Sequence, residues 1–160
     1  AAPRIDFYGV GSSGLAAHDD HNKFLRINKF TLSSSDPHEQ VLSATSLRPG
    51  DAAVFFSYSG ETHDTIETFE IARQSGATTI SVTRYGKNPL SEAADISLYI
   101  SSAESMIRSG AMGSRISQMA VVDILYTAVS SRIYDKVKPY LDKTRLTSRR
   151  KRFNGKKQEG

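Results

Sequence analysis

The sequence predicts an α/β fold: a doubly wound, five-stranded parallel sheet in flavodoxin-like order, with a layer of helices on each face. Short apolar runs alternate with longer amphipathic stretches along the 160 residues, a pattern typical of βαβ units. The apolar runs are nearly continuous, as strands are when helices cover both faces of a sheet. Right-handed crossovers between parallel strands then complete a three-layer α/β/α arrangement.

The first part of the chain supplies two strands and two helices. An apolar strand is expected at residues 5–10, where glycine closes the run, and apolar residues at helical spacing predict a helix over 15–27. A short strand follows at 29–32. Residues 37–46 are expected to form a short helix, because Asp36 can cap it and a proline suits its first position.

The middle of the chain repeats this alternation. A buried strand is expected at 52–56 after a turn, and a helix over 65–74 is stopped by Ser-Gly. Residues 77–83 are dominated by β-branched side chains and predict the fourth strand. A short helix near 91–94, after an Asn-Pro break, leads into the fifth strand at 95–100.

The last predicted helix covers residues 114–137, after a long loop at 101–113. Its apolar side chains fall on nearly every side, and a helix of that kind is buried on every side. One side can cover the sheet, whereas the other needs a partner. We therefore expect a homodimer or a higher oligomer.

Basic residues are concentrated at the carboxyl end of the chain. Seven of the 21 Lys and Arg residues lie in residues 144–160 beside one acid, which leaves 14 bases and 16 acids in the rest. The body therefore lacks the basic surplus of a nucleic-acid platform. We expect one domain at residues 1–146 and a basic, disordered tail at 147–160.

Composition excludes several kinds of site. The chain has no cysteine, so it has neither disulfides nor thiolate metal sites. Its four histidines are scattered without metal-ligand spacing, and we expect no metal and no cofactor. No apolar run approaches the roughly 20 residues of a membrane span, and no secretion signal is visible. We expect a cytoplasmic protein without a membrane partner.

The first candidate loop follows the first strand and reads Gly9-Val10-Gly11-Ser12-Ser13-Gly14. Glycines allow a sharp turn, the following helix offers unpaired N–H groups, and Ser12 and Ser13 add hydroxyl donors. The GxGxxG spacing holds, but the acidic partner of a dinucleotide ribose is missing after the second strand, because Asp36 serves as a helix cap. A simple strand-to-helix turn remains the alternative for this loop alone.

The second candidate loop follows the third strand and reads Ser57-Tyr58-Ser59-Gly60-Glu61-Thr62. Hydroxyls, turn amides and a helix N-terminus can surround a phosphate without any lysine. The alternative is helix capping by Ser59 or Thr62, which needs only one hydroxyl. Two such loops after strands that should be neighbours favour binding of a phosphorylated ligand at the carboxyl edge of the sheet.

These loops resemble those of a sugar isomerase (SIS) domain, and the resemblance extends over residues 5–137. It also includes Gly76-Ala77, Ile80-Ser81-Val82-Thr83, Pro89-Leu90 and Ala94-Asp95. More narrowly, other segments resemble the RpiR family, whose members are bacterial transcriptional regulators. These segments are Ala17-His18-Asp19 with Lys23, Asp36-Pro37-His38, and Ser109-Gly110-Ala111-Met112-Gly113-Ser114-Arg115-Ile116 with Gln118.

The resemblance implies a domain that senses a sugar phosphate and contacts DNA only through an N-terminal helix-turn-helix, which this chain lacks. It assigns phosphate contacts to Ser13, Ser57, Ser59 and Thr62, and it places Ser12 and Gly60 beside them. The chain then reads as a piece of a longer protein. Asn28 stands where the family usually has glycine, and asparagine tolerates the left-handed conformation expected there.

Three functional hypotheses remain from sequence: a ligand-sensing module, a sugar-phosphate isomerase on the same fold, and a dimerisation domain with a vestigial pocket. Fold alone does not separate them. An isomerase needs a base near the sugar carbons, and Glu104, in the loop after the fifth strand, is the one placed candidate. Glu104 could equally contact a sugar hydroxyl or be a solvated loop acid. The RpiR-like segment around 110–115 favours a sensor without catalytic residues.

Overall fold

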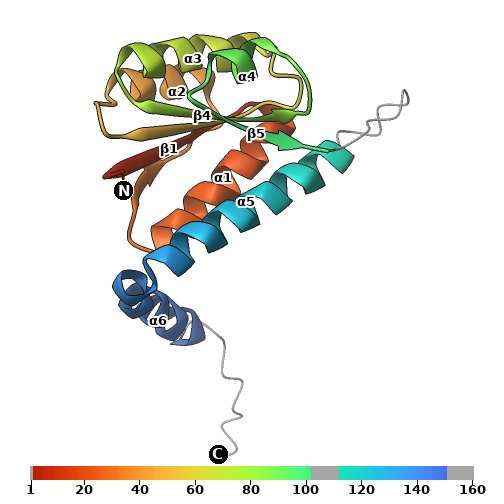
Figure 1. The fold of residues 1–160 in the computed structure, drawn as a ribbon. Helices are drawn as coiled ribbons and strands as arrows, with labels where there is room; N and C mark the ends of the chain where they lie inside the picture. Colours follow the sequence, from red (N-terminus) through yellow and green to blue (C-terminus); the bar gives the residue numbers. More distant parts are fainter. Residues whose placement is uncertain (1, 102–111, 151–160) are drawn as a thin grey trace, which may run out of the picture.

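Five parallel strands form one sheet in the order β2-β1-β3-β4-β5 (Figure 1). The computed structural model describes residues 2–101 and 112–150. The strands are β1 (Arg4–Tyr8), β2 (Phe30–Leu32), β3 (Ala52–Phe56), β4 (Thr78–Arg84) and β5 (Ile96–Ile100). This is the flavodoxin-like order that the sequence predicted.

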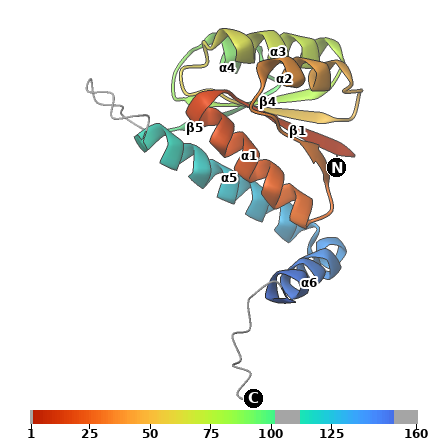
Figure 2. The ribbon, with the colours of Figure 1, turned by 180° about the vertical axis from the view of Figure 1, so that it is seen from behind.

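Helices cover both faces of the sheet, which confirms the predicted three layers (Figure 2). One face carries α1 (Gly11–Arg26) and α5 (Met112–Arg132), which pack side by side. The other face carries α2 (Pro37–Thr45), α3 (His63–Gln74) and α4 (Pro89–Ala93). In the described part of the chain, no helix combines the length and apolar character needed to cross a bilayer.

The sheet divides the core into two clusters because neighbouring strand residues point to opposite faces. Phe7 and Phe56 lie under α1 and α5, whereas Tyr8 and Phe55 lie under α2 and α3. All four side chains are fully buried. Strands β1 and β3 are therefore apolar on both faces, which explains why their sequence reads as continuous rather than alternating runs.

Asp6 joins β1 to helix α2 through a buried polar cluster. Its carboxylate accepts hydrogen bonds from Arg4, Ser43 and the Tyr8 hydroxyl, and from the Leu32 amide of β2. Burial, with the nearby Asp6 charge, raises the pKa of Tyr8 above its usual range, so this hydroxyl stays a donor. The cluster fixes β1, and with it the start of the loop that follows.

Two local predictions about helix ends are confirmed, and an ion pair links α1 to α5. Asp36 caps α2, since its carboxylate accepts the amides of His38 and Glu39. Asn28 adopts the left-handed conformation with φ of 59° after α1. Lys23 pairs with Asp19 one turn earlier at 2.6 Å, and it also contacts Asp123 of α5.

The prediction of one final helix over 114–137 is wrong. Helix α5 ends at Arg132, and a separate helix, α6 (Tyr134–Arg150), begins two residues later and turns back (Figure 1). Val137 of α6 returns to the core and is 2% exposed. The apolar spacing continues across the turn because both helices contribute buried side chains, so periodicity does not reveal the change of direction.

One further expectation about the carboxyl half is confirmed, and one needs correction. The described residues leave the outer side of α5 uncovered, as the apolar pattern predicted, because Ile116 and Ile124 are 67% and 68% exposed. Helix α6 extends to Arg150, so the first four residues of the predicted tail, 147–150, are helical. The Thr147 hydroxyl donates to the Lys143 carbonyl one turn earlier at 3.0 Å, as it can where the helix continues. Residues 151–160 lie outside the described part.

Asp20 of α1 is a fully buried carboxyl, and neither of its oxygens has a hydrogen-bond partner among the described residues. Burial raises the pKa of Asp20 to about 8, and the nearby Lys23 charge only partly opposes this. The folded protein therefore keeps Asp20 protonated at pH values where the unfolded chain has lost that proton. Folding takes up a proton across this window.

We predict that Asp20→Asn stabilises the protein, and more strongly near pH 8 than near pH 5. Stability of the unsubstituted protein should fall as pH rises from about 4 toward 8, by at most about 1.4 kcal/mol per pH unit from this group. Thermal unfolding at several pH values measures the difference. Asp19→Asn, at the neighbouring ion-paired carboxyl, is the control and should bring no such gain. A gain independent of pH would contradict the buried acid.

Candidate anion-binding site

The two predicted loops follow neighbouring strands at the carboxyl edge of the sheet. Strand β1 pairs with β3 in parallel, with Tyr8 opposite Phe55, so both chains leave the sheet at the same level. The strand order reverses here, because β2 lies on one side of β1 and β3 on the other. Crevices at such switch points are the usual ligand sites of open α/β sheets.

The loop after β3 is organised by its own hydroxyl groups. The Ser57 hydroxyl is buried; it accepts the Gly60 amide at 3.1 Å and pairs with the Thr62 hydroxyl at 3.2 Å. The Ser59 hydroxyl accepts the Glu61 amide at 3.2 Å. Thr62 precedes α3, yet its side chain accepts no hydrogen bond from the amides of this fully described helix. Helix capping by Thr62 or Ser59, the alternative from sequence, therefore does not account for these hydroxyls.

Gly60 is required by the shape of this loop. Its φ is +71°, and a Cβ placed there would lie 1.9 Å from Oδ1 of Asn88. Asn88 is buried, donates to Thr83 at 3.1 Å, and caps α4 by accepting the Ser91 amide at 2.9 Å. In the sequence, Asn88 is recognisable only as part of a chain break. Its role as the support of the second loop depends on a tertiary contact that local spacing does not show.

The loop after β1 leads directly into α1, so Ser12 and Ser13 lie in the first helical turn. Amides of this turn lack intrahelical partners and carry the positive end of the helix dipole. Ser13 is 8% exposed, and its hydroxyl accepts a hydrogen bond from Gln118 of α5 at 3.1 Å. Gly9 lies so close to β3 that a Cβ there would be 3.1 Å from the Phe56 carbonyl.

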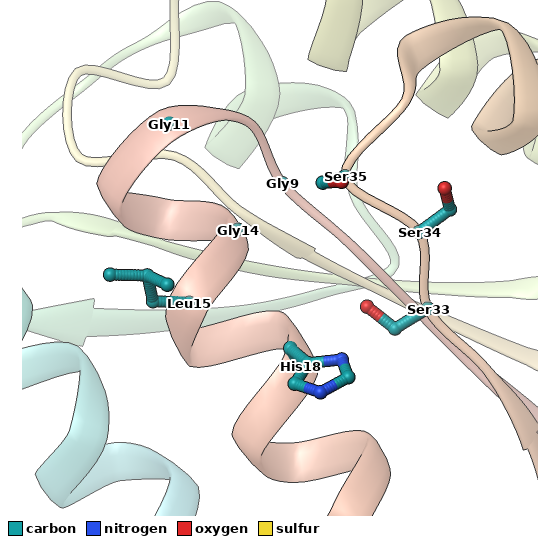
Figure 3. Close-up of a pocket in the computed structure, with 8 residues that line it drawn as sticks. All are labelled: Gly9, Gly11, Gly14, Leu15, His18, Ser33, Ser34 and Ser35. Carbon is teal, nitrogen blue, oxygen red and sulfur yellow. The ribbon is translucent and has the colours of Figure 1, made fainter.

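A groove of about 470 Å³ adjoins the first loop on the β2 side of α1 (Figure 3). The lining residues belong to the loop after β1, to α1 and to the segment after β2: Gly9, Gly11, Gly14, Leu15, His18, Ser33, Ser34 and Ser35. Buried Gln40 joins the two sides, because its amide donates to the carbonyls of Gly9 and Ser34, both at 2.8 Å. This groove was not predicted from the sequence, because the serine segment carries no acid and no other local signal of a ligand site.

The site offers an anion neutral donors rather than cations. Neither loop contains Lys or Arg, so the positive potential comes from turn amides and from the N-termini of α1 and α3. Six of the predicted site residues lie on these two loops: Ser12, Ser13, Ser57, Ser59, Gly60 and Thr62. Glu104 lies outside the described residues. Among those described, no group of three or more His, Asp or Glu side chains could hold a metal ion.

Comparison with known families decides the identity of this fold. The model of the SIS domain matches residues 1–128, which include every strand and both loops. The chain belongs to the SIS domain family. The predicted resemblance is thereby confirmed for the domain.

Individual SIS relatives agree with the narrower resemblance. A protein of Caldanaerobacter subterraneus subsp. tengcongensis, named as an HTH-type transcriptional regulator, is 49% identical over 143 residues, which are 89% of this chain and 51% of that protein. The structure of Vibrio vulnificus NanR complexed with ManNAc-6P has a TM-score of 0.83 and 25% identity over 91% of this chain and 55% of NanR.

The SIS domain of an RpiR transcription factor from Sphaerobacter thermophilus shares the fold, with a TM-score of 0.77 at 20% identity over 91% of this chain and 79% of that one. This SIS chain spans about half the length of the Caldanaerobacter relative.

We predict that Gly60→Ala distorts the second loop, whereas Gly50→Ala is tolerated better. Both glycines have positive φ, but only Gly60 faces a neighbour that a methyl group would meet. The conformational strain of about 1–3 kcal/mol is common to both variants, and the clash with Asn88 is added only in Gly60→Ala. Chemical denaturation measures the two losses of stability. Equal losses would show that the loop yields to the methyl group at no cost.

Proposed function

We propose that this chain is the effector domain of a helix-turn-helix transcriptional regulator and that it senses a sugar phosphate. The observation that carries the proposal is the pairing of two hydroxyl-rich loops after adjacent strands, each leading into the N-terminus of a helix. Such an arrangement supplies several neutral donors to one anion. A phosphate is the anion whose several acceptor oxygens match this number of donors.

In the proposed complex, the hydroxyls of Ser13, Ser57, Ser59 and Thr62 surround the phosphate. Amides near Ser12 and Gly60 complete the set. Ser57 and Thr62 already hydrogen-bond each other at 3.2 Å, so their oxygens lie together before any ligand arrives. NanR, a structural neighbour in complex with ManNAc-6P, supports a phosphorylated sugar as the ligand class.

The regulatory part of the proposal rests on the Caldanaerobacter relative, whose name describes an HTH-type transcriptional regulator. The body of this chain has fewer bases than acids, so DNA recognition is assigned to a helix-turn-helix segment outside it. The amino end of β1 lies at the opposite end of the domain from the two loops (Figure 1). A ligand signal would therefore have to cross the domain to reach a preceding segment.

We propose sensing rather than turnover, because removing a carbon-bound proton requires a base near the sugar carbons. Among described residues, the loops themselves offer only Glu61, which is exposed, and His18 lines the neighbouring groove. Isomerisation of an aldose or ketose phosphate is the alternative. It predicts steady turnover that disappears in Glu104→Gln.

The second part of the proposal is self-association, in which a second copy of this chain covers the exposed side of α5. The uncovered side of α5 carries Ile116 and Ile124, and a shallow groove beside Ile124 is lined by small side chains such as Ala128 and Ser131. Large exposed side chains on one helix face favour association. A symmetric dimer would cover the same face on both copies.

We predict that replacing Ser57 and Ser59 together by alanine weakens binding of the cognate sugar phosphate by tenfold or more. A hydrogen bond to a charged group contributes about 1.5–3 kcal/mol, which is roughly one to two orders of magnitude in affinity. Calorimetry on a panel that includes ManNAc-6P gives the constants. Thr45→Ala, which removes an exposed hydroxyl on α2, is the control and should bind as the unsubstituted chain does. Unchanged affinity in the double variant would reject the phosphate assignment.

We also predict that the chain sediments as a dimer or larger species at tens of micromolar, and that Ile124→Lys shifts it toward monomer. A charged side chain in an apolar interface loses its hydration without gaining a partner. Leu42→Lys is the matched control, because Leu42 is 56% exposed but lies on α2, on the other face of the sheet. Dissociation by both variants, or by neither, would argue against the α5 face.

A further inference from the structure

Helix α5 connects the candidate phosphate site with the opposite end of the domain. It comprises 21 residues, about 30 Å of helix, and runs beside α1 (Figure 1). Its first half touches the loop after β1 through Gln118, and its last residue precedes α6. The amino end of β1 lies at the same end of the domain as α6 (Figures 1 and 2). The far end of α5 and the amino end of β1 therefore lie at the same end of the domain.

The contact between Gln118 and Ser13 is buried and has a defined direction. Gln118 is 1% exposed, and its Nε2 donates to Oγ of Ser13 at 3.1 Å. A serine hydroxyl has one proton to donate and can accept at the same time. Because the amide supplies the donor, the single Ser13 proton remains free for an anion, and an accepted hydrogen bond strengthens that donation.

We propose that Gln118 is a positioning residue that holds Ser13 as a donor to the bound phosphate and links occupancy of the site to α5. This inference rests on the proposed function, because it requires an anion at Ser13. A donor on α5 is what the geometry needs: an acceptor in the same place would take the Ser13 proton and leave the anion facing a lone pair.

The chemistry of Gln118 can be changed without changing its size. Gln118→Glu replaces the donor by an acceptor of the same shape, so Ser13 would donate to the carboxylate and the anion would also meet a negative charge. Gln118→Leu removes the hydrogen bond and puts an apolar side chain of similar volume in place of the amide. Ser130→Ala removes a different buried polar group of α5, the Ser130 hydroxyl, and is the control for general effects on this helix.

Sulfate is a suitable probe, because it occupies phosphate sites and stays a dianion between about pH 5 and pH 7.5. Each variant would be titrated with sulfate at both pH values, and amide NMR shifts would be followed in the two loops and in α5. The unsubstituted chain, measured in parallel, accounts for native groups that titrate in this range.

We expect Gln118→Leu to bind sulfate about tenfold more weakly and to lose the shifts in α5 while the loop shifts remain. Gln118→Glu should bind more weakly still near pH 7.5 and recover part of its affinity near pH 5, because burial raises the pKa of the new carboxyl and its protonated form can donate to Ser13. A merely structural role for Gln118 would give no such recovery.

The outcomes separate this inference from the proposed function. If sulfate and sugar phosphates shift no loop amide in the unsubstituted chain, the phosphate site itself is rejected, and the role of Gln118 with it. If the unsubstituted chain binds sulfate, and Gln118→Leu and Ser130→Ala both bind it with the same affinity as the unsubstituted chain, only the positioning role is rejected.

A double substitution tests the route through Ser13. If Gln118 acts through that hydroxyl, Gln118→Leu should have little further effect once Ser13→Ala is present. Losses that multiply independently would show that Gln118 reaches the anion by another route, and this would overturn the inference.

Discussion

The parallel pairing of β1 with β3 is the constraint on which the candidate site depends. It brings two loops that are more than forty residues apart in sequence to one edge of the sheet, and it does so at the point where the strand order reverses. Both strands are buried on both faces, so their register cannot slip without exposing one of the two cores. The Asp6 cluster adds a polar restraint to β1, because a shift of the strand would separate Asp6 from the Ser43 hydroxyl of α2 and from the Leu32 amide of β2.

Most of the fold could be predicted because the strands and the first three helices are specified by local sequence signals. Asp36 before a proline, the apolar run at 52–56 and the glycine after 65–74 each specify an element through their own neighbours. The turn at Ile133 could not be found in this way. What ends α5 is the gain from returning Val137 to the core beside α1, which is a tertiary effect on a pattern that reads as one helix.

The site shows the same division between local and tertiary information. Hydroxyl-rich sequences before helices identify the two loops, and sheet order then brings them to one edge. The residues that support these loops could not be predicted from the sequence. Asn88, which lies against Gly60, and Gln118, which donates to Ser13, come from distant parts of the chain. Such residues occupy helical or turn positions that have no distinctive local sequence, and only the tertiary contact reveals their role. Gln40, between Gly9 and the serine segment, is a third example.

Two loops without Lys or Arg are proposed to bind a phosphate through neutral donors, and thermal unfolding with phosphorylated sugars and with their parent sugars tests this most directly. Ligand that binds only the native state raises the midpoint of unfolding. The account predicts that at least one sugar phosphate raises the midpoint in proportion to the logarithm of its concentration, while the parent sugar at equal concentration does not. A panel in which no phosphorylated sugar stabilises the chain, or in which the parent sugar stabilises it equally, would contradict the account.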